Sequence, residues 1–168
     1  KKNSNLLIKK HEYLGDFQKI EIEFNKKKYS FATNLIGKIQ VKNILFAALA
    51  ASKSKIKFSK IIELISEIKA VEGRLENVGN IKNNSKVILD YAHTPDALKN
   101  TLESIKEQFK HSSIAIVFGC GGDRDKNKRS IMGKIANNYC DKIFLTDDNP
   151  RYENPKKIRN QIKKKISR

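Results

Sequence analysis

Three short stretches of this sequence concentrate side chains that bind charged small molecules, and each follows an apolar run. They are DYAHTPDAL at residues 90–98, GCGGDRDKNKR at residues 119–129 and TDDNPR at residues 146–151. The apolar runs have the length and composition of buried β-strands. In a parallel sheet the carboxyl ends of the strands meet at one edge, where ligands gather. We therefore expect the three stretches to form one binding edge.

The glycine-rich stretch joins a predicted strand to a predicted helix, a place where backbone amides can meet an anion. Its glycines permit positive φ and close backbone approach. It matches neither the phosphate-binding loop GxxxxGK[ST] nor the dinucleotide fingerprint GxGxxG. Arg124, between Asp123 and Asp125, has the fork that binds a carboxylate, and the two acids would orient it. The alternative is a glycine-rich turn with a solvated, charged tip.

The TDDNPR stretch combines groups that suit both ends of an amino acid. Pro150 biases Asn149 toward an extended backbone. Arg151 suits a carboxylate, while Asp148 and the Asn149 carbonyl can accept from an ammonium. Together with Arg124 they predict a receptor for a zwitterionic amino-acid head. The alternative is an ordinary turn that leads into a helix.

The DYAHTPDAL stretch has two readings of equal weight. The carboxylate of Asp90 could bind ribose hydroxyls while Tyr91 or His93 packs against a base; equally, Asp90 could be a structural cap and His93 an ordinary loop histidine. Arg74, in GRLE at residues 73–76, is either a ligand for an anion or a surface arginine.

The pattern of predicted secondary structure that must position these residues changes along the chain. From residue 6 to residue 33 short segments alternate, with a turn at residues 25–27, which predicts antiparallel strands. Two helices follow: one at residues 41–52, apolar on nearly every side and hence buried, and one at residues 59–68. From Lys86 onward strand-like and helix-like runs alternate, which is typical of a parallel sheet with crossover helices.

The predicted fold is therefore α/β. In its second part the expected strands are KVILDYA, IAIVFG and KIFLT, and the expected helices span residues 95–109, 128–139 and 154 onward. Thr94 is predicted to cap the first of these helices, with Pro95 at the first helical position. The domain boundary is placed so that residues 1–71 and 72–168 form the two parts.

The charge of the chain is strongly positive, with 35 Lys and Arg against 18 Asp and Glu and a formal charge of +17. Such an excess suits a polyanion, so nucleic-acid binding stays open. The lysines are scattered through every segment, however, and no zinc-finger or RNA-recognition motif accompanies them. A solvated lysine surface, with no nucleic-acid partner, is the favoured interpretation.

The cysteines and the apolar runs bear on location. Cys120 and Cys140 have no CxxC spacing, so neither a zinc site nor a disulfide framework is indicated, and a reducing compartment is the simplest interpretation. The longest apolar run, at residues 44–51, is too short to span a bilayer, and no signal sequence opens the chain. We expect a cytoplasmic protein without a membrane partner.

In order and spacing, GRLE and the three stretches above closely resemble the carboxyl-terminal domain of the Mur ligases, in particular the branch that adds diaminopimelate to UDP-N-acetylmuramoyl-L-alanyl-D-glutamate. The resemblance runs from Gly73 to the end of the chain. Upstream, GKIQVKNILFAALAA looks like the last helices of the family's central ATP-binding domain. The resemblance implies a Rossmann-like parallel-sheet domain, preceded by the tail of the central domain.

What this resemblance implies is an ATP-dependent amide ligase of peptidoglycan precursor synthesis. In the family, ATP phosphorylates the γ-carboxylate of the D-glutamate, and the amine of meso-diaminopimelate attacks the acyl phosphate, which releases ADP and phosphate. Magnesium offsets the phosphate charge. The implied partners are therefore small molecules: meso-diaminopimelate, the UDP-linked dipeptide and ATP.

The resemblance also assigns residues to two binding sites. The family's diaminopimelate site falls on Arg124, Asp148, Asn149, Pro150 and Arg151.

The ATP site falls on Asn43, Arg74, Asp90, Tyr91 and His93. Here the sequence departs from the family, because Ile39 and Gln40 stand where a phenylalanine and the first asparagine of the adenine-side motif FNxxN are usual.

Other family features have no counterpart in this sequence: the GxxGK[ST] loop, the magnesium-binding lysine and histidine region, the uridine-nucleotide domain and a glycine-rich stretch after the last helix. We therefore expect a piece of the ligase that contains no catalytic residue and is inactive alone. Three rivals stay open: a binding module without catalysis, a basic nucleic-acid-binding protein, and a lysine-adding relative, which Arg151 disfavours.

Overall fold

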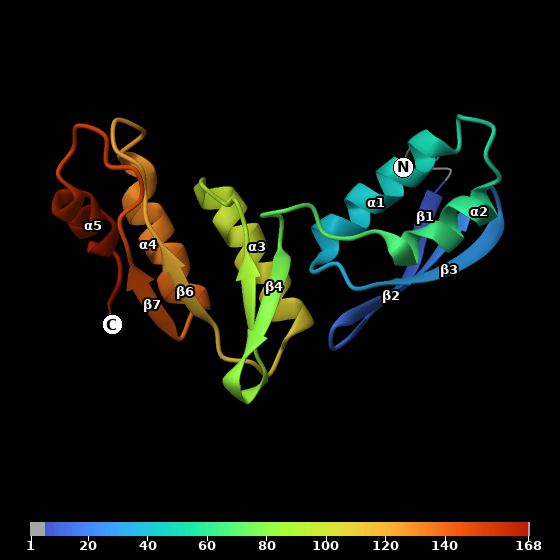
Figure 1. Ribbon diagram of the computed structural model, residues 1–168, viewed down its shortest axis with the longest axis horizontal. Coiled ribbons are helices and arrows are strands. Elements are labelled where there is room, and N and C mark those ends of the chain that lie inside the picture. The colour runs from blue at the N-terminus through green and yellow to red at the C-terminus, as the bar shows by residue number, and fades with distance from the viewer. Residues whose placement is uncertain (1–5, 168) are drawn as a thin grey trace. The chain divides into compact units, whose positions relative to one another are not determined.

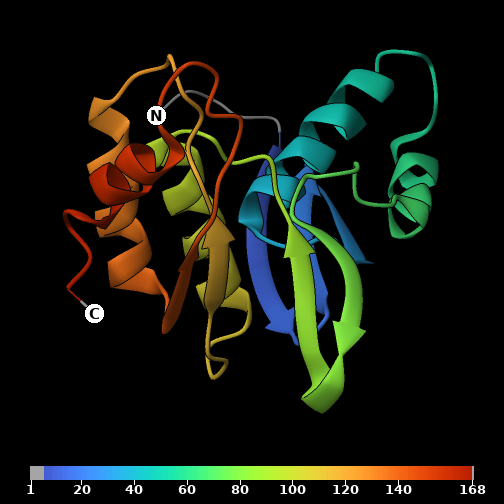
Figure 2. The ribbon, with the colours of Figure 1, turned by 60° about the vertical axis from the view of Figure 1, so that its left-hand side comes forward.

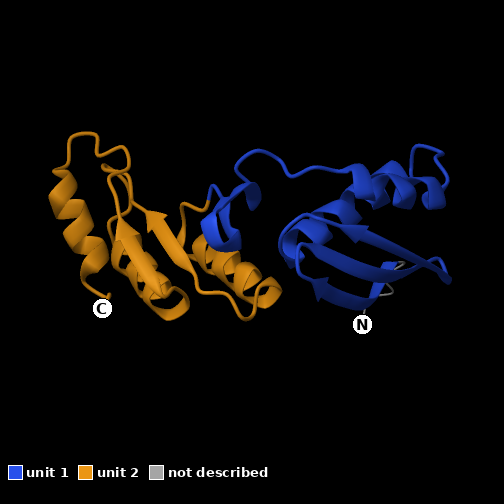
Figure 3. Ribbon diagram, turned by 60° about the horizontal axis from the view of Figure 1, so that its bottom comes forward, with its two compact units in different colours: residues 1–91 blue, residues 92–168 orange. Residues whose placement is uncertain are grey.

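The computed structural model describes residues 6–167 of the chain. Its backbone forms two compact units, residues 1–91 and residues 92–168 (Figure 3). This division lies later in the sequence than the predicted domain boundary, and a compact unit need not coincide with a family domain. The ranges 1–71 and 72–168 therefore stay a prediction, of which residues 1–5 and 168 lie outside the described residues.

The first unit opens with an antiparallel sheet of β1 (Leu6–Leu14), β2 (Phe17–Phe24) and β3 (Lys27–Thr33), in that order (Figure 1). The tight turn between β2 and β3 holds Asn25 and Lys26 at φ 49° and 64°. Left-handed backbone at both central residues is what a two-residue hairpin requires. The predicted strands and turn are confirmed.

Two helical segments pack against this sheet. They are α1 (Lys38–Ala51) and α2 (Phe58–Glu63), the latter continued by the 3₁₀ turn η1 (Leu64–Glu67). The prediction that the first helix is buried on nearly every side is wrong. Val41 is fully buried, but on the other face Phe46 is 70% exposed and Ile39 45%. Only one face of α1 meets the sheet of this unit, so the rest of its apolar surface is uncovered.

The strand predicted at KVILDYA pairs differently from the expectation. It forms β5 (Ser85–Leu89), which pairs antiparallel with β4 (Glu76–Ile81). The connection between them, η2 (Lys82–Asn84), is far too short for a parallel crossover, which takes a dozen residues or more. A short connection therefore makes this pair a hairpin, and among the described residues β4 and β5 form a sheet separate from that of β6 and β7.

The second unit contains the parallel pair β6 (Ala115–Phe118) and β7 (Lys142–Leu145), joined through α4 (Asn127–Tyr139) (Figure 2). Its other helices are α3 (Pro95–Gln108) and α5 (Pro155–Lys163). The predicted crossover and its helices are confirmed. So is the cap of α3, because the hydroxyl of Thr94 accepts from the amide of Ala97 at 3.3 Å.

The core of this unit lies between the helices and one face of the parallel pair. Ile116 and Leu145 contribute from the strands, Leu98 from α3, Met132 from α4 and Ile162 from α5. Each helix presents its apolar stripe to the strands and leaves its charged face outside. The packing holds the ends of β6 and β7 in fixed positions. No helix in the described part of the chain is long and apolar enough to cross a membrane.

Candidate functional site

The exits of β6 and β7 lie side by side, as the sequence predicts for two of its three stretches. Phe118 pairs with Leu145 at the end of the ladder, and the amide of Thr146 donates to the carbonyl of Phe118 at 3.0 Å. The first loop, residues 119–126, then runs against the second loop, residues 146–154. We call these the glycine loop and the amino-acid loop.

Close backbone packing joins the two loops and explains the glycines. The amide of Gly122 donates to the carbonyl of Asn149 at 2.9 Å. A Cβ atom on Gly122 would lie 1.8 Å from the carbonyl oxygen of Pro150, and one on Gly119 would lie 2.5 Å from that of Thr146. Both contacts are with backbone atoms, which cannot move aside as a flexible side chain can. Only glycine fits at these positions.

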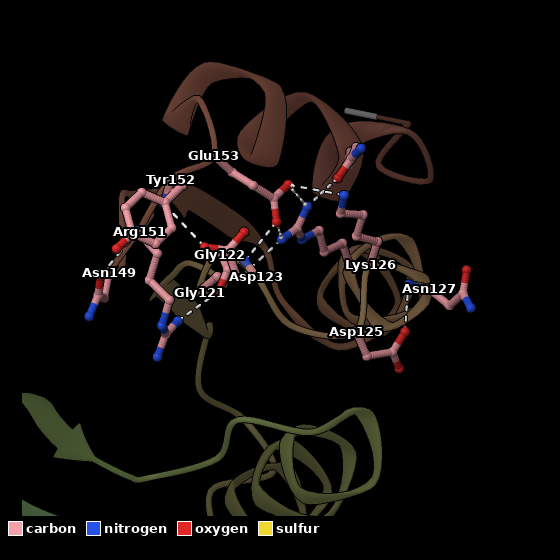
Figure 4. A network of polar contacts seen from close by, with 12 residues as sticks. Gly121, Gly122, Asp123, Asp125, Lys126, Asn127, Asn149, Arg151, Tyr152 and Glu153 are labelled. Carbon is pink, nitrogen blue, oxygen red and sulfur yellow. Dashed lines mark hydrogen bonds and ion pairs between the residues drawn. The ribbon is translucent and has the colours of Figure 1, made fainter.

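The ion pair between Arg129 and Glu153, which sequence reasoning missed, joins the two loops and is almost completely buried. Arg129, on α4, is 0% exposed and binds Glu153 in a bidentate manner, Nη1 to Oε2 and Nη2 to Oε1, each at 2.9 Å. Its Nη2 also donates to the carbonyl of Gly121 at 3.0 Å, and its Nη1 to Oε1 of Gln161 at 2.6 Å. Glu153 accepts further from the amide of Asp123 at 2.8 Å (Figure 4).

Each member of this ion pair stabilises the charged form of the other. Hydrogen bonds from Arg129 and from the amide of Asp123 lower the pKa of Glu153 to about 2. The hydrogen bonds to Glu153 likewise raise the pKa of Arg129. The carboxylate is therefore charged at any physiological pH. The signal in the sequence was an arginine in the first turn of the helix after the glycine loop, with an acid two residues beyond Arg151.

The expectation that acids orient Arg124 is wrong. The carboxylate of Asp123 accepts from the amide of Tyr152 at 3.2 Å, and that of Asp125 from the amide of Asn127 at 2.8 Å, at the start of α4 (Figure 4). Short acidic side chains next to free backbone amides are used as caps. Arg124 is exposed and, among the described residues, has no hydrogen bond or ion pair.

The other predicted amino-acid ligands lie together on the amino-acid loop. The guanidinium of Arg151 donates from Nη1 to the carbonyl of Gly122 at 2.7 Å, and its amide donates to the side chain of Asn149 at 3.2 Å. Asp148 accepts from the amide of Asn149 at 2.7 Å. Arg151 has φ 49°, a left-handed conformation that is uncommon outside glycine. Pro150 is the residue on which Gly122 packs.

The structure also brings together most of the residues predicted for the nucleotide, within the first unit. Gln40, on α1, donates from Nε2 to the carbonyl of Arg74 at 2.8 Å, and its Oε1 accepts from Nδ2 of Asn43 at 3.4 Å. The guanidinium of Arg74 lies 4.6 Å from the ring centre of Tyr91, a cation–π contact. Three of the predicted residues, Asn43, Arg74 and Tyr91, thus share one exposed cluster.

The other two residues predicted for the nucleotide site, Asp90 and His93, make hydrogen bonds with other parts of the chain. Asp90 accepts from the amide of Leu75 at 3.0 Å, a contact that suits the structural interpretation of this carboxylate, and its role at the ribose stays a prediction. The carbonyl of His93 accepts from Nζ of Lys128 at 2.7 Å in the second unit. The stretch 90–98 therefore straddles the division between the units, and its place on the predicted edge stays a prediction.

Metal and thiol chemistry have little support here. Among the described residues no group of three or more His, Cys, Asp or Glu side chains gathers to hold a metal ion. Both cysteines are free and buried. Burial raises the pKa of Cys120, which makes its thiol unreactive.

Comparison with known proteins decides the family. The model of the Mur ligase glutamate ligase domain matches residues 73–168. This chain belongs to the Mur ligase family. The match begins at the residue where the resemblance to Mur ligases begins in the sequence, and it includes the glycine loop and the amino-acid loop.

Relatives within the Mur ligase family are close in sequence. The UDP-N-acetylmuramoyl-L-alanyl-D-glutamate–2,6-diaminopimelate ligase of Rickettsia felis is 46% identical over 146 residues, which cover 86% of this chain and 27% of the relative. The ligase of the same name from Rickettsia bellii is 43% identical over 161 residues, 95% of this chain and 33% of the relative. The chain thus spans between a quarter and a third of the length of these relatives.

Solved structures agree with this Mur ligase assignment. A ligase of the same name has a TM-score of 0.67 and 28% identity, over 99% of this chain and 34% of its own. A folylpolyglutamate synthase from Mycobacterium tuberculosis, solved with ADP and AMPPCP, has a TM-score of 0.76 at 17% identity, over 98% of this chain and 37% of its own. The second likeness shows the shared fold alone.

Proposed function

We propose that this chain is part of an ATP-dependent amide ligase that adds meso-2,6-diaminopimelate to UDP-N-acetylmuramoyl-L-alanyl-D-glutamate, in peptidoglycan precursor synthesis. The observation that carries the proposal is the amino-acid loop, in which Asp148, Asn149 and Arg151 are held together against the glycine loop. The printed names of the relatives in two Rickettsia species supply the reaction.

The amino-acid loop suits diaminopimelate because that substrate carries a zwitterionic head at its distal end. Arg151 would receive the distal carboxylate, and Asp148 with the Asn149 carbonyl would receive the distal ammonium. Arg124, exposed and without a described partner, can turn toward the same carboxylate. Lysine lacks this carboxylate and would leave the arginines without a partner, so the site discriminates against it.

ATP is the proposed cofactor, and the cluster of Asn43, Arg74 and Tyr91 would bind its nucleotide. An arginine stacked on an exposed tyrosine offers positive charge to phosphates and an aromatic face to a base. Asp90 and His93 stay proposed contacts near the ribose and base. Gln40 already donates to the carbonyl of Arg74, so we propose that it shapes this cluster and leaves the adenine contact to Asn43.

Two further parts of the proposal rest on the family. Magnesium would neutralise the phosphates when bound, and we assign no residue of this chain to it. Two free, buried cysteines suit a reducing compartment, so we propose that the reaction takes place in the cytoplasm. No residue described here is proposed to act on the reacting atoms.

The test is the replacement Arg151→Ala in the complete ligase, assayed with meso-diaminopimelate and with L-lysine. Loss of the arginine should lower kcat/KM for diaminopimelate about 100-fold or more, as expected for a polar group that a site is built to pair, and should leave the low rate with lysine almost unchanged. Lys134→Ala removes one exposed positive charge from α4 and is the matched control. Unchanged selectivity in Arg151→Ala would contradict the site.

Binding and phosphate-release assays on the complete ligase distinguish the rival functions. A binding module would take up diaminopimelate without releasing phosphate from ATP. A nucleic-acid-binding protein, which the charge of +17 keeps in view, would bind an oligonucleotide with an affinity that falls steeply with salt and does not depend on Arg151. Either result without ligation would replace the proposed function.

A further inference from the structure

We propose that Arg129 and Glu153 are positioning residues, a buried clasp that holds the amino-acid loop in its binding shape before the substrate arrives. The inference rests on the proposed function for its readout. It goes further by assigning substrate selectivity to an ion pair that does not touch the substrate.

The first argument is that both terminal nitrogens of the Arg129 guanidinium are fully used within the protein. Four hydrogen bonds leave the two terminal nitrogens of Arg129: two to Glu153, one to the carbonyl of Gly121 and one to Gln161. These two nitrogens carry four N–H bonds in all. The remaining donor, Nε, has no hydrogen-bond partner among the described residues, but the side chain is 0% exposed, so a ligand in solution cannot reach it. Arg129 is therefore built to hold protein atoms and not a substrate.

The second argument is where the clasp is attached. Gly121 and the amide of Asp123 belong to the glycine loop, while Glu153 belongs to the amino-acid loop. Arg129 and Glu153 thus connect the two loops. On the glycine loop they contact Gly121 and Asp123, the two neighbours of Gly122, whose carbonyl binds Arg151. Lys126 adds a weaker ion pair with Glu153 at 3.8 Å.

The third argument is the backbone of Arg151 itself. Its left-handed φ of 49° is costly for a residue with a side chain, so the loop does not favour this shape by itself. Glu153 follows two residues later, and Tyr152 between them donates its amide to Asp123. Because these contacts fix the chain just after Arg151, they set the direction of its side chain. Without the clasp we expect the loop to sample other shapes.

The experiment replaces Glu153 by Gln in the complete ligase, a change that keeps the shape and removes the charge. We expect KM for diaminopimelate to rise about tenfold or more, because small displacements of positioning groups cost that much or more, and the preference over lysine to fall by a similar factor. KM for ATP should stay within twofold. The matched control is Glu103→Gln, whose carboxylate accepts from the hydroxyl of Tyr139 at 2.6 Å elsewhere in the same unit.

A second readout does not depend on ligation. Amide hydrogen exchange of the substrate-free protein should be faster at Gly122, Asp123 and Tyr152 in Glu153→Gln than in the wild type, and unchanged there in Glu103→Gln. Faster exchange in Glu153→Gln than in wild type, together with a wild type that has no ligase activity, would uphold the clasp while the proposed function fails. Unchanged exchange, or faster exchange with unchanged KM and selectivity, would overturn the positioning role.

A milder variant covers the case in which Glu153→Gln fails to fold. Gln161→Leu removes one acceptor of Arg129 and leaves the ion pair intact. Compared with Glu153→Gln, it should increase amide exchange and KM for diaminopimelate in the same direction but by a smaller amount. A Gln161→Leu protein with normal exchange and normal KM would then count against the clasp.

Discussion

The two clusters of predicted ligands differ in how firmly the protein holds them. On the amino-acid side, two loops are joined by backbone contacts at Gly119 and Gly122 and by the buried pair of Arg129 and Glu153. On the nucleotide side, Gln40 and Tyr91 make single contacts with Arg74 at the surface, and Tyr91 is 65% exposed. The contacts on the amino-acid side thus lie largely in the interior, and the side-chain contacts on the nucleotide side lie at the surface.

The chemistry of the two proposed ligands would account for this difference. Choosing one amino acid over a near relative requires donors and acceptors in fixed positions, because a misplaced group loses its discrimination. A nucleotide offers a triphosphate and an aromatic base, which bind through charge and stacking and tolerate adjustable partners. Under the proposed function, rigidity would be concentrated where selectivity is needed.

The largest effect is expected from Gly122→Ala. A Cβ atom there would overlap the carbonyl oxygen of Pro150 at 1.8 Å, and the loops would have to separate. Overpacking of this kind costs about 3 kcal/mol, and thermal unfolding should show a melting temperature lower by roughly 10 °C. Gly79→Ala is the control, since nothing lies within 4 Å of its Cβ position. Equal melting temperatures of the two variants would refute the close packing.

A smaller effect is expected from the titration of Glu153. Because its pKa falls from 4.5 in the unfolded chain to about 2 in the folded one, its contribution to stability is fully present above pH 4.5 and is lost as the pH falls toward 2. Wild type should therefore be more stable than Glu153→Gln at pH 6, and the gap should close between pH 4.5 and 2. Chemical unfolding of both proteins at several pH values measures this difference in stability. A constant gap would show that Glu153 acts without its charge.

The smallest effect is expected from Tyr91→Leu on the nucleotide side. The exposed cation–π contact with Arg74 contributes about 0.5 kcal/mol, so the melting temperature should barely change. Affinity of the complete ligase for ATP should nevertheless fall several-fold, since the aromatic face is lost. A large loss of stability would show that this cluster is as firmly built as the amino-acid side. Unchanged ATP affinity would remove Tyr91 from the proposed site.

Local patterns carried much of the prediction. Alternation and turn residues predicted the antiparallel strands and the hairpin at Asn25, and the parallel pair with its crossover helix followed from alternating strand and helix runs. The cap at Thr94 depends on the residue and its neighbour Pro95. Such features are decided within a few residues, so the sequence shows them directly.

The misses involve contacts that the local residue pattern does not define, whether the partner is near or distant in the sequence. Nothing near Phe46 shows that its face of α1 is left uncovered, and the pairing of β5 with β4 depends on a connection whose length only the strand ends define. The acids beside Arg124 were expected to orient it, yet Asp123 caps Tyr152 and Asp125 caps Asn127. A short carboxylate reaches whichever amide the folded backbone brings near.

The sequence by itself determined the family, the α/β class and which residues gather at the exits of β6 and β7, because these follow from order, spacing and the period of apolar residues. Only the tertiary structure decided how those residues are held. Arg129 and Glu153 are 24 residues apart, and their pairing depends on α4 and the amino-acid loop packing against each other. Burial and hydrogen-bond geometry belong to the folded chain, and they turn two ordinary charges into a support for the binding loop.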